Sequence, residues 1–234
     1  MKNFLLGEQM LAVIFDFNGV IINDSWLHEL AWKEVIYELT GNQFNDETIK
    51  KTVHGRINRE IFNHVLKRDL SADEAEQLSE LKECKYRKLF IENIAKLQID
   101  GSIEKIFNYL TKQQIPFTIA TASGLKNLQF FMQQLGLDRW FNIEKISYDD
   151  GSIPGKPHPQ IYLNAAQNIE SDINRCIVIE DAITGVQSAK AAGAGIIIGY
   201  GVSHPHDELK QHGANLIMNS FDEFPYEQLE NKAF

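Results

Sequence analysis

Residues 11–21 read Leu-Ala-Val-Ile-Phe-Asp-Phe-Asn-Gly-Val-Ile, a continuous apolar run that ends in an acid and then turns through a glycine. The run is too short for a helix core and is rich in β-branched residues, which is typical of a strand buried on both faces of a parallel sheet. Asp16 follows this strand, at the position where ligands bind in open α/β sheets. A carboxylate there can ligate a metal, attack an electrophile or only cap the turn.

Further buried strands alternate with helices in the second half of the chain. Helices are expected over 103–110, 125–135, 160–169 and 184–192, and the expected strands cover 116–121, 143–147, 176–181, 195–199 and 214–218. Strands that alternate with helices form a parallel sheet with right-handed crossovers. The sequence therefore predicts an α/β fold with a Rossmann-like parallel sheet.

The segment between the first two strands has a helical pattern throughout. Helices are expected over 25–40, 45–53, 59–66 and 72–97, with Asp24 and Ser25 offering N-cap oxygens to the first. Ser71 and Glu74 have the spacing of a capping box at the start of the last. We expect a core of residues 1–23 and 99–234, with an all-helical cap of residues 24–98 inserted into it.

The composition restricts the class of partner. A net charge of −9 argues against nucleic acid, because no broad basic field is available to neutralise phosphates. The two cysteines, Cys84 and Cys176, have no metal-site spacing and are expected to be buried or inert. No signal peptide or membrane span is evident. A monomeric cytoplasmic protein that does not associate with membranes is the expectation.

Reactive polar groups follow three of the buried strands. They are Asp16, Thr121 and the pair Glu180-Asp181, and Lys156 comes from a loop before the last of these strands. The ends of parallel strands meet at one edge of a sheet, so these groups are expected to converge. Carboxylates are ligands for Mg²⁺, a hydroxyl and backbone N–H groups hold phosphate oxygens, and a lysine balances charge. These are the groups that phosphoryl transfer requires, although Thr121 and Ser123 taken alone would also fit a helix cap.

The order and the residue types of these motifs resemble those of the haloacid dehalogenase superfamily, in its β-phosphoglucomutase-like branch. The resemblance runs from about residue 10 to 220. The matching segments are Asp16-Phe17-Asn18-Gly19-Val20, Thr121-Ala122-Ser123, Lys156-Pro157-His158-Pro159 and Glu180-Asp181 followed by residues 182–189. The resemblance implies a Mg²⁺-dependent enzyme that acts on a small phosphorylated metabolite and whose cap selects the substrate.

The same resemblance assigns roles to individual residues. Asp16 is the expected nucleophile and forms an aspartyl phosphate, assisted by Thr121 and Lys156. The Mg²⁺ ligands are expected to be Asp16, the backbone carbonyl of Asn18, Glu180 and Asp181. The phosphate and the rest of the substrate are expected to contact Gly19, Ala122, Ser123, His28, Gly55, Arg56, Arg59 and Lys82.

Asn18 departs from the family pattern, in which the second acid of the first motif is the general acid and base. An amide cannot deliver or accept a proton at neutral pH, although its backbone carbonyl can still bind the metal. The sequence therefore predicts a phosphatase with impaired proton transfer. Asn-Gly is also the dipeptide most prone to deamidation.

Three other interpretations stay open at this point. His28, Lys82 and the loop 55–60 resemble substrate-facing elements of β-phosphoglucomutase, which keeps a phosphosugar mutase possible. Lys82 and Arg59 would fit equally well as solvated charges on a helix. A native Asn18 would also suit a sensor that binds a phosphometabolite or holds a long-lived phosphoaspartate. A purely structural partner protein fits the polar strand ends poorly.

Overall fold

The computed structural model describes residues 12–53, 57–201 and 204–229. The chain divides into two compact units, one made of residues 1–22 and 99–234 and the other of residues 23–98. Within the described residues, no helix combines the length and apolar character needed to cross a membrane.

A parallel five-stranded sheet forms the centre of the first unit, with strand order β2-β1-β3-β4-β5. The strands are β1 (Ala12–Phe15), β2 (Phe117–Ile119), β3 (Cys176–Glu180), β4 (Ile196–Tyr200) and β5 (Leu216–Met218). Every residue of β1 is fully buried between its two neighbours, as the apolar run predicted. The predicted α/β fold is confirmed.

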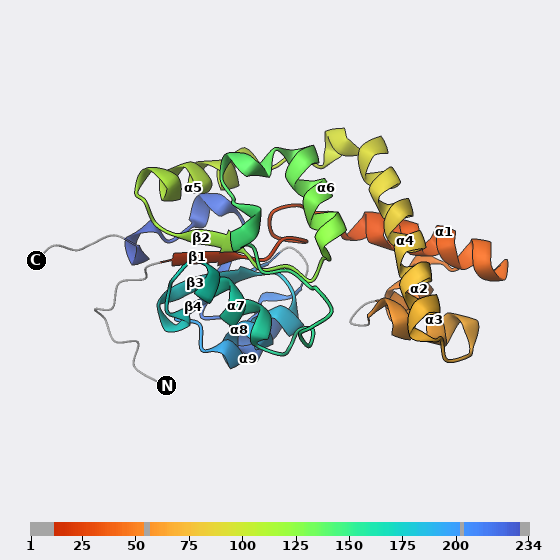
Figure 1. Cartoon of the computed structure of the whole chain (residues 1–234). Helices are drawn as coiled ribbons and strands as arrows, with labels where there is room; N and C mark the ends of the chain where they lie inside the picture. The colour runs from red at the N-terminus through yellow and green to blue at the C-terminus, as the bar shows by residue number, and fades with distance from the viewer. Residues whose placement is uncertain (1–11, 54–56, 202–203, 230–234) are drawn as a thin grey trace, which may run out of the picture. The chain divides into compact units, whose positions relative to one another are not determined.

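Helices cover both faces of this sheet (Figure 1). They are α5 (Gly101–Lys112), α6 (Leu125–Leu135), α7 (Gln160–Asn168), α8 (Ile183–Ala192) and α9 (His206–His212). Successive residues of a strand point to opposite faces, so β1 contributes to two cores. Ala12 and Ile14 pack with the aliphatic side chains of α7, α8 and α9. Phe15 instead meets Phe107 of α5, with ring centroids 5.2 Å apart.

One predicted strand of this unit is wrong. Residues 143–147 form a 3₁₀ turn (Ile143–Lys145) rather than a strand. Of that segment only Ser147 pairs with the sheet, through an isolated parallel bridge to Ala120 beyond the end of β2. The apolar residues that suggested a strand, Ile143 and Ile146, lie in and just after the turn, and Ile146 is buried there.

Within its described residues, the second unit contains helices joined by loops and has no strand. Its helices are α1 (Ser25–Thr40), α2 (Asp46–Val53), α3 (Asn58–Leu66) and α4 (Ala72–Glu92), followed by a 3₁₀ turn (Ile94–Lys96). Trp32 and Ile36 of α1 pack with Phe62 of α3 in a buried apolar cluster. This cluster gives the unit its own core.

Helix α4 begins at the predicted capping box. The Ser71 side chain accepts a hydrogen bond from the Glu74 backbone N–H, and the Glu74 carboxylate accepts one from the Ser71 N–H. Two backbone donors that the helix leaves unpaired are satisfied in this way. Helix α1 differs from the prediction, because the side chain of its N-cap residue Asp24 makes no capping hydrogen bond.

Candidate active site

Asp16 directly follows β1, at the edge of the sheet where the parallel strands end. Its backbone N–H donates to the carbonyl of Ile179 at 2.9 Å, which continues the pairing between β1 and β3 by one residue. The residue is 7 % exposed. The register with β3 therefore fixes the carboxylate beside the end of that strand.

The turn after Asp16 is shaped by backbone hydrogen bonds and by Gly19. The Gly19 N–H donates to the carbonyl of Ile22 at 2.7 Å, and the Ile21 N–H donates to the carbonyl of Phe17 at 2.9 Å. Gly19 has φ +87°, a left-handed conformation that favours glycine. A Cβ atom at Gly19 would also overlap the Asp181 carboxylate. Only glycine allows the turn to lie against that acid.

Glu180, the last residue of β3, is 1 % exposed and accepts three hydrogen bonds. Oε1 accepts from Lys156 Nζ at 2.5 Å and from the Tyr162 hydroxyl at 2.9 Å, and Oε2 accepts from the Ala182 N–H at 2.9 Å. Three donors compensate the cost of burying this charge.

Lys156 connects the ends of β1 and β3. Its ammonium group donates to Asp16 Oδ1 at 2.6 Å as well as to Glu180, and it lies over the ring of Tyr162, 5.0 Å from the centroid. Burial alone would lower the pKa of Lys156, but the carboxylates of Asp16 and Glu180 outweigh burial and hold that pKa well above its ordinary value. The lysine is therefore a fixed positive charge within the acidic cluster.

The pKa of Asp16 is raised well above its ordinary value. Burial is the largest cause, and the neighbouring charges of Glu180 and Asp181 add to it, while Lys156 opposes them. Three carboxylates against one ammonium leave an excess of negative charge at this edge. A bound cation would remove that excess and favour the ionised form of Asp16 that a nucleophile requires.

The acids of this cluster fit a divalent cation. One carboxylate oxygen from each of Asp16, Glu180 and Asp181 lies within 4.8 Å of the others, and all three residues are buried. Hard oxygen donors suit Mg²⁺, and the absence of a side chain at Gly19 leaves room for the Asp181 carboxylate beside the turn. The prediction that these three acids converge is therefore confirmed.

Thr121 and Ser123 lie in the segment after β2. Thr121 is fully buried, and its Oγ1 accepts from the Ser123 N–H at 3.1 Å. The Ser123 hydroxyl donates to Asn18 Oδ1 at 3.2 Å, while Ala122 between them is exposed. Helix α6 begins without a side-chain cap at Gly124, so neither hydroxyl serves as the N-cap that the sequence left as an alternative. Ser123 instead joins this segment to the turn after Asp16.

Two candidates of the helical unit lie together inside it. Lys82 of α4 is 3 % exposed, and its Nζ lies 2.7 Å from His28 Nδ1 of α1 and 2.9 Å from Glu83 Oε1. Burial lowers the pKa of Lys82, although Glu83 opposes the effect. The interpretation of Lys82 as a solvated helix charge is therefore wrong, because the side chain lies in a buried polar cluster.

Asp24 explains why the predicted N-cap is not made. Its fully buried carboxylate accepts from the Tyr86 hydroxyl, and His28 Nε2 lies 3.5 Å from the same oxygen. The rings of His28 and Tyr86 stack at 4.0 Å. A tertiary contact to α4 has replaced the local cap, and it orients His28.

Arg59 of α3 is exposed, and its guanidinium donates to the carbonyl of Leu70 at 2.9 Å. Gly55 and Arg56 lie outside the described residues. Cys176 is buried, which raises its pKa to about 12, whereas Cys84 is exposed.

Tyr162 and Tyr86 were not among the residues predicted from the sequence, and Asp24 was expected only as a helix cap. Tyr162 belongs to the apolar face of α7, and its hydroxyl finds Glu180 only because α7 packs against β3. Tyr86 occurs four residues after Lys82, so it lies on the same face of α4, and this spacing was the one available signal.

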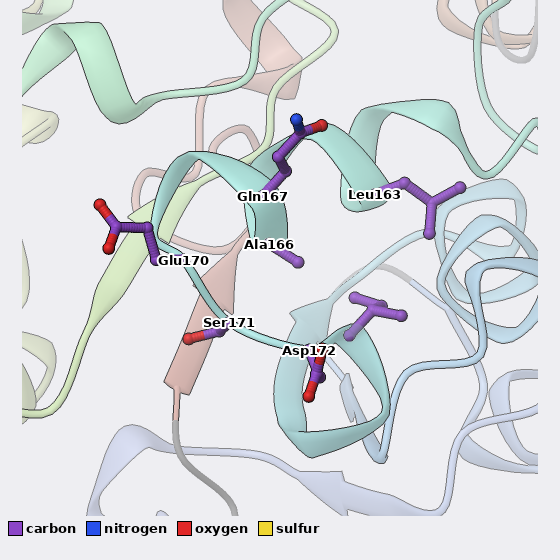
Figure 2. Close-up of a pocket in the computed structure, with 7 residues that line it drawn as sticks. Leu163, Ala166, Gln167, Glu170, Ser171 and Asp172 are labelled. Carbon is purple, nitrogen blue, oxygen red and sulfur yellow. The ribbon is translucent and has the colours of Figure 1, made fainter.

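A separate hollow of about 470 Å³ lies at the end of α7 and before β3 (Figure 2). Its lining includes Glu170 and Asp172 and contains no cationic side chain. Because β3 begins at Cys176 and the acidic cluster follows its last residue, this hollow lies toward the opposite edge of the sheet. It does not suit a phosphate and is not part of the candidate active site.

Comparison with known proteins identifies the family. Residues 10–193 match the family described as haloacid dehalogenase-like hydrolase. A phosphorylated carbohydrates phosphatase of Thermotoga maritima is 25 % identical, with 83 % of this chain and 86 % of that protein covered. A β-phosphoglucomutase of Bacillus subtilis is also 25 % identical, with 95 % of both chains covered.

Solved structures agree with this result. The crystal structure of a family IA, variant 3 hydrolase of the haloacid dehalogenase type from Entamoeba histolytica superposes with a TM-score of 0.88, at 38 % identity, covering 94 % of this chain and 97 % of the other. The family match spans more than half of the chain and includes the first motif, Lys156 and the acidic pair. The protein therefore belongs to the haloacid dehalogenase-like hydrolase family.

Proposed function

We propose that the protein is a Mg²⁺-dependent phosphatase of a small phosphorylated metabolite, and that proton transfer limits its turnover. The observation that carries the proposal is the cluster of Asp16, Glu180, Asp181 and Lys156 at one edge of the sheet. The names of the relatives, a phosphatase of phosphorylated carbohydrates and a β-phosphoglucomutase, favour a phosphosugar as the substrate class.

In the first step, Asp16 attacks phosphorus and the bond from phosphorus to the leaving oxygen breaks, which gives an aspartyl phosphate on Asp16. Lys156, held by Glu180, balances negative charge on the transferring group. Asp16, Asp181, Glu180 and the Asn18 carbonyl would hold Mg²⁺, which supplies further charge stabilisation when bound. Gly19, in the turn after β1, and Ala122 and Ser123, in the segment after β2, would contact the phosphate.

Asn18 sets the limit in this scheme. An alkoxide leaving group needs a proton, and the water that later attacks the aspartyl phosphate must lose one, but an amide serves neither purpose. Aryl phosphates avoid the first need because their leaving groups are stable as anions. The scheme therefore predicts fast phosphorylation of Asp16 by activated substrates and slow hydrolysis afterwards.

The helical unit is proposed to act as a cap that selects the substrate, with residues 24–98 as its extent. His28 contacts Asp24, Tyr86 and Lys82, and these contacts restrict the orientation of its ring. We therefore propose it as the first of the substrate contacts. Arg59 and Lys82 are proposed as further contacts with a sugar or a second phosphate, together with Gly55 and Arg56.

Acetyl phosphate with Mg²⁺ tests the proposal directly. Intact-protein mass spectrometry is expected to show one added phosphate, mapped to Asp16, and the Asp16→Asn variant is expected to show none. Omission of Mg²⁺ is expected to prevent labelling. A protein that remains unlabelled with acetyl phosphate and Mg²⁺ contradicts the proposed nucleophile.

A sensor is the second candidate, and Asn18 is the observation that favours it. A phosphoaspartate without a neighbouring general base would persist. If the label on Asp16 survives for hours and no phosphorylated sugar is hydrolysed, the sensor is favoured. Transfer of phosphate from a sugar bisphosphate to a sugar monophosphate would instead favour a mutase.

A further inference from the structure

The pair Asn18-Gly19 is the only Asn-Gly dipeptide among the 234 residues. In such a pair, the glycine amide nitrogen loses its proton to solvent and forms a bond to the Asn18 side-chain carbon. The bond between that carbon and the Asn18 side-chain nitrogen then breaks, and the nitrogen leaves as ammonia. Water opens the resulting succinimide ring at either carbonyl, which gives aspartate or isoaspartate. Conversion to aspartate would place a carboxylate two residues after Asp16.

The fold requires a glycine at position 19. Gly19 has φ +87°, and a Cβ atom there would overlap the Asp181 carboxylate. A larger residue, which would slow the attack of the backbone nitrogen, is thus excluded by the acidic cluster itself. With an asparagine at position 18, the Asn-Gly sequence is unavoidable.

The folded turn also restrains both reacting groups. The Gly19 N–H, whose nitrogen is the attacking atom, donates to the Ile22 carbonyl at 2.7 Å. The Asn18 side chain, which carries the carbon under attack, accepts from the Ser123 hydroxyl at 3.2 Å. Both hydrogen bonds must be broken before the Gly19 nitrogen and the Asn18 side-chain carbon can approach in the geometry of the ring.

Opening the turn exposes apolar surface as well. Val20, Ile21 and Ile22 are each no more than 4 % exposed, and Phe17 stacks on Phe131 with ring centroids 4.4 Å apart. A turn whose side chains belong to the core opens rarely, in contrast to an exposed loop.

We infer that Asn18 is a latent aspartate whose deamidation is suppressed by the folded turn and proceeds when the chain unfolds. The inference concerns the chemistry of residues 18 and 19 and holds whether or not the proposed phosphatase activity is found. Molecules that have unfolded and refolded would carry aspartate or isoaspartate at position 18, and molecules that stayed folded would retain the amide.

Peptide mass spectrometry measures this without any assay of activity. The protein is incubated at 37 °C and neutral pH, in buffer and in guanidinium chloride, and the peptide that contains Asn18 is quantified over time. Digests of the Asn18→Asp variant provide the reference for the aspartate form. Deamidation in buffer is expected to be at least about tenfold slower than in denaturant, since these two hydrogen bonds and the buried turn must be disrupted first. Comparable rates in the two solutions would overturn the inference.

The Ser123→Ala variant separates the two restraints. It removes the hydroxyl that holds the Asn18 side chain and leaves the backbone bond of Gly19 in place. Faster deamidation than in the parent protein is expected in buffer, with an identical rate in denaturant, where no turn exists. An unchanged rate in buffer overturns the part of the inference that assigns protection to Ser123. A faster rate in denaturant overturns the interpretation that the effect acts through the fold.

Discussion

From the proposed function, the substitution Asn18→Asp is expected to raise the rate of phosphate-ester hydrolysis. The two side chains have the same shape, so the hydrogen bond from the Ser123 hydroxyl, 3.2 Å from Oδ1, is retained. The change adds only a group that can hold and release a proton. A positioned general acid or base contributes about 10²–10⁴ in rate, which corresponds to about 2.7–5.4 kcal/mol of the activation free energy.

The assay compares an aryl phosphate with a hexose phosphate under pre-steady-state and steady-state conditions. The parent protein is expected to release about one equivalent of aryl alcohol in a burst and then to slow, because the aspartyl phosphate lacks a base for its hydrolysis. The Asp variant is expected to turn over both substrates without the slow phase. Its gain with the hexose phosphate is expected to be the larger, since that leaving group also needs a proton.

Two controls sharpen this test. Asn18→Ala removes the amide without adding a carboxylate, and it is expected to be no faster than the parent. Deamidated molecules must also be counted, because a variant about 10³ times faster would double the apparent rate when present at about 0.1 %. Equal steady-state rates for the parent and the Asp variant on the hexose phosphate would refute the assignment of proton transfer to position 18.

Four further outcomes are expected. Tyr162→Phe removes one of three donors to the buried Glu180 and is expected to lower the free energy of unfolding by about 1–3 kcal/mol in urea titrations, whereas Tyr200→Phe, in β4, is expected to change it little; equal effects would contradict this reasoning. Because the pKa of Asp16 is raised in the folded state, folding takes up a proton, so the free energy of unfolding in EDTA is expected to fall as the pH rises above about 3.9 toward that raised pKa. Mg²⁺ at 100 times its dissociation constant is expected to raise the free energy of unfolding by about 2.7 kcal/mol, and a melting temperature that does not change when Mg²⁺ is added would count against the metal site. Ser71→Ala removes the cap of α4 and is expected to cost about 0.5–2 kcal/mol by circular dichroism, with rescue by Ser71→Asp; no loss would show that packing alone sets this helix end.

The sequence by itself determined the α/β fold and, apart from the strand wrongly expected over residues 143–147, the order of its elements. The run ending at Asp16, the glycine that follows it and the acidic pair after β3 are local patterns, and each is dictated by neighbours a few residues away. Parallel strands end at one edge, so the meeting of Asp16, Glu180 and Asp181 could be expected from those patterns alone. The capping box at Ser71 was readable for the same reason.

Only the tertiary structure decided which group each polar side chain contacts. Tyr162 and Glu180 are 18 residues apart, and Asp24 and Tyr86 are 62 residues apart, so no local pattern relates them. For Asp24, the buried hydroxyl of Tyr86 displaced the helix cap that the sequence favoured. A charged side chain inside a protein binds whatever donor packing brings to it, because an uncompensated buried charge costs more than the loss of a local contact.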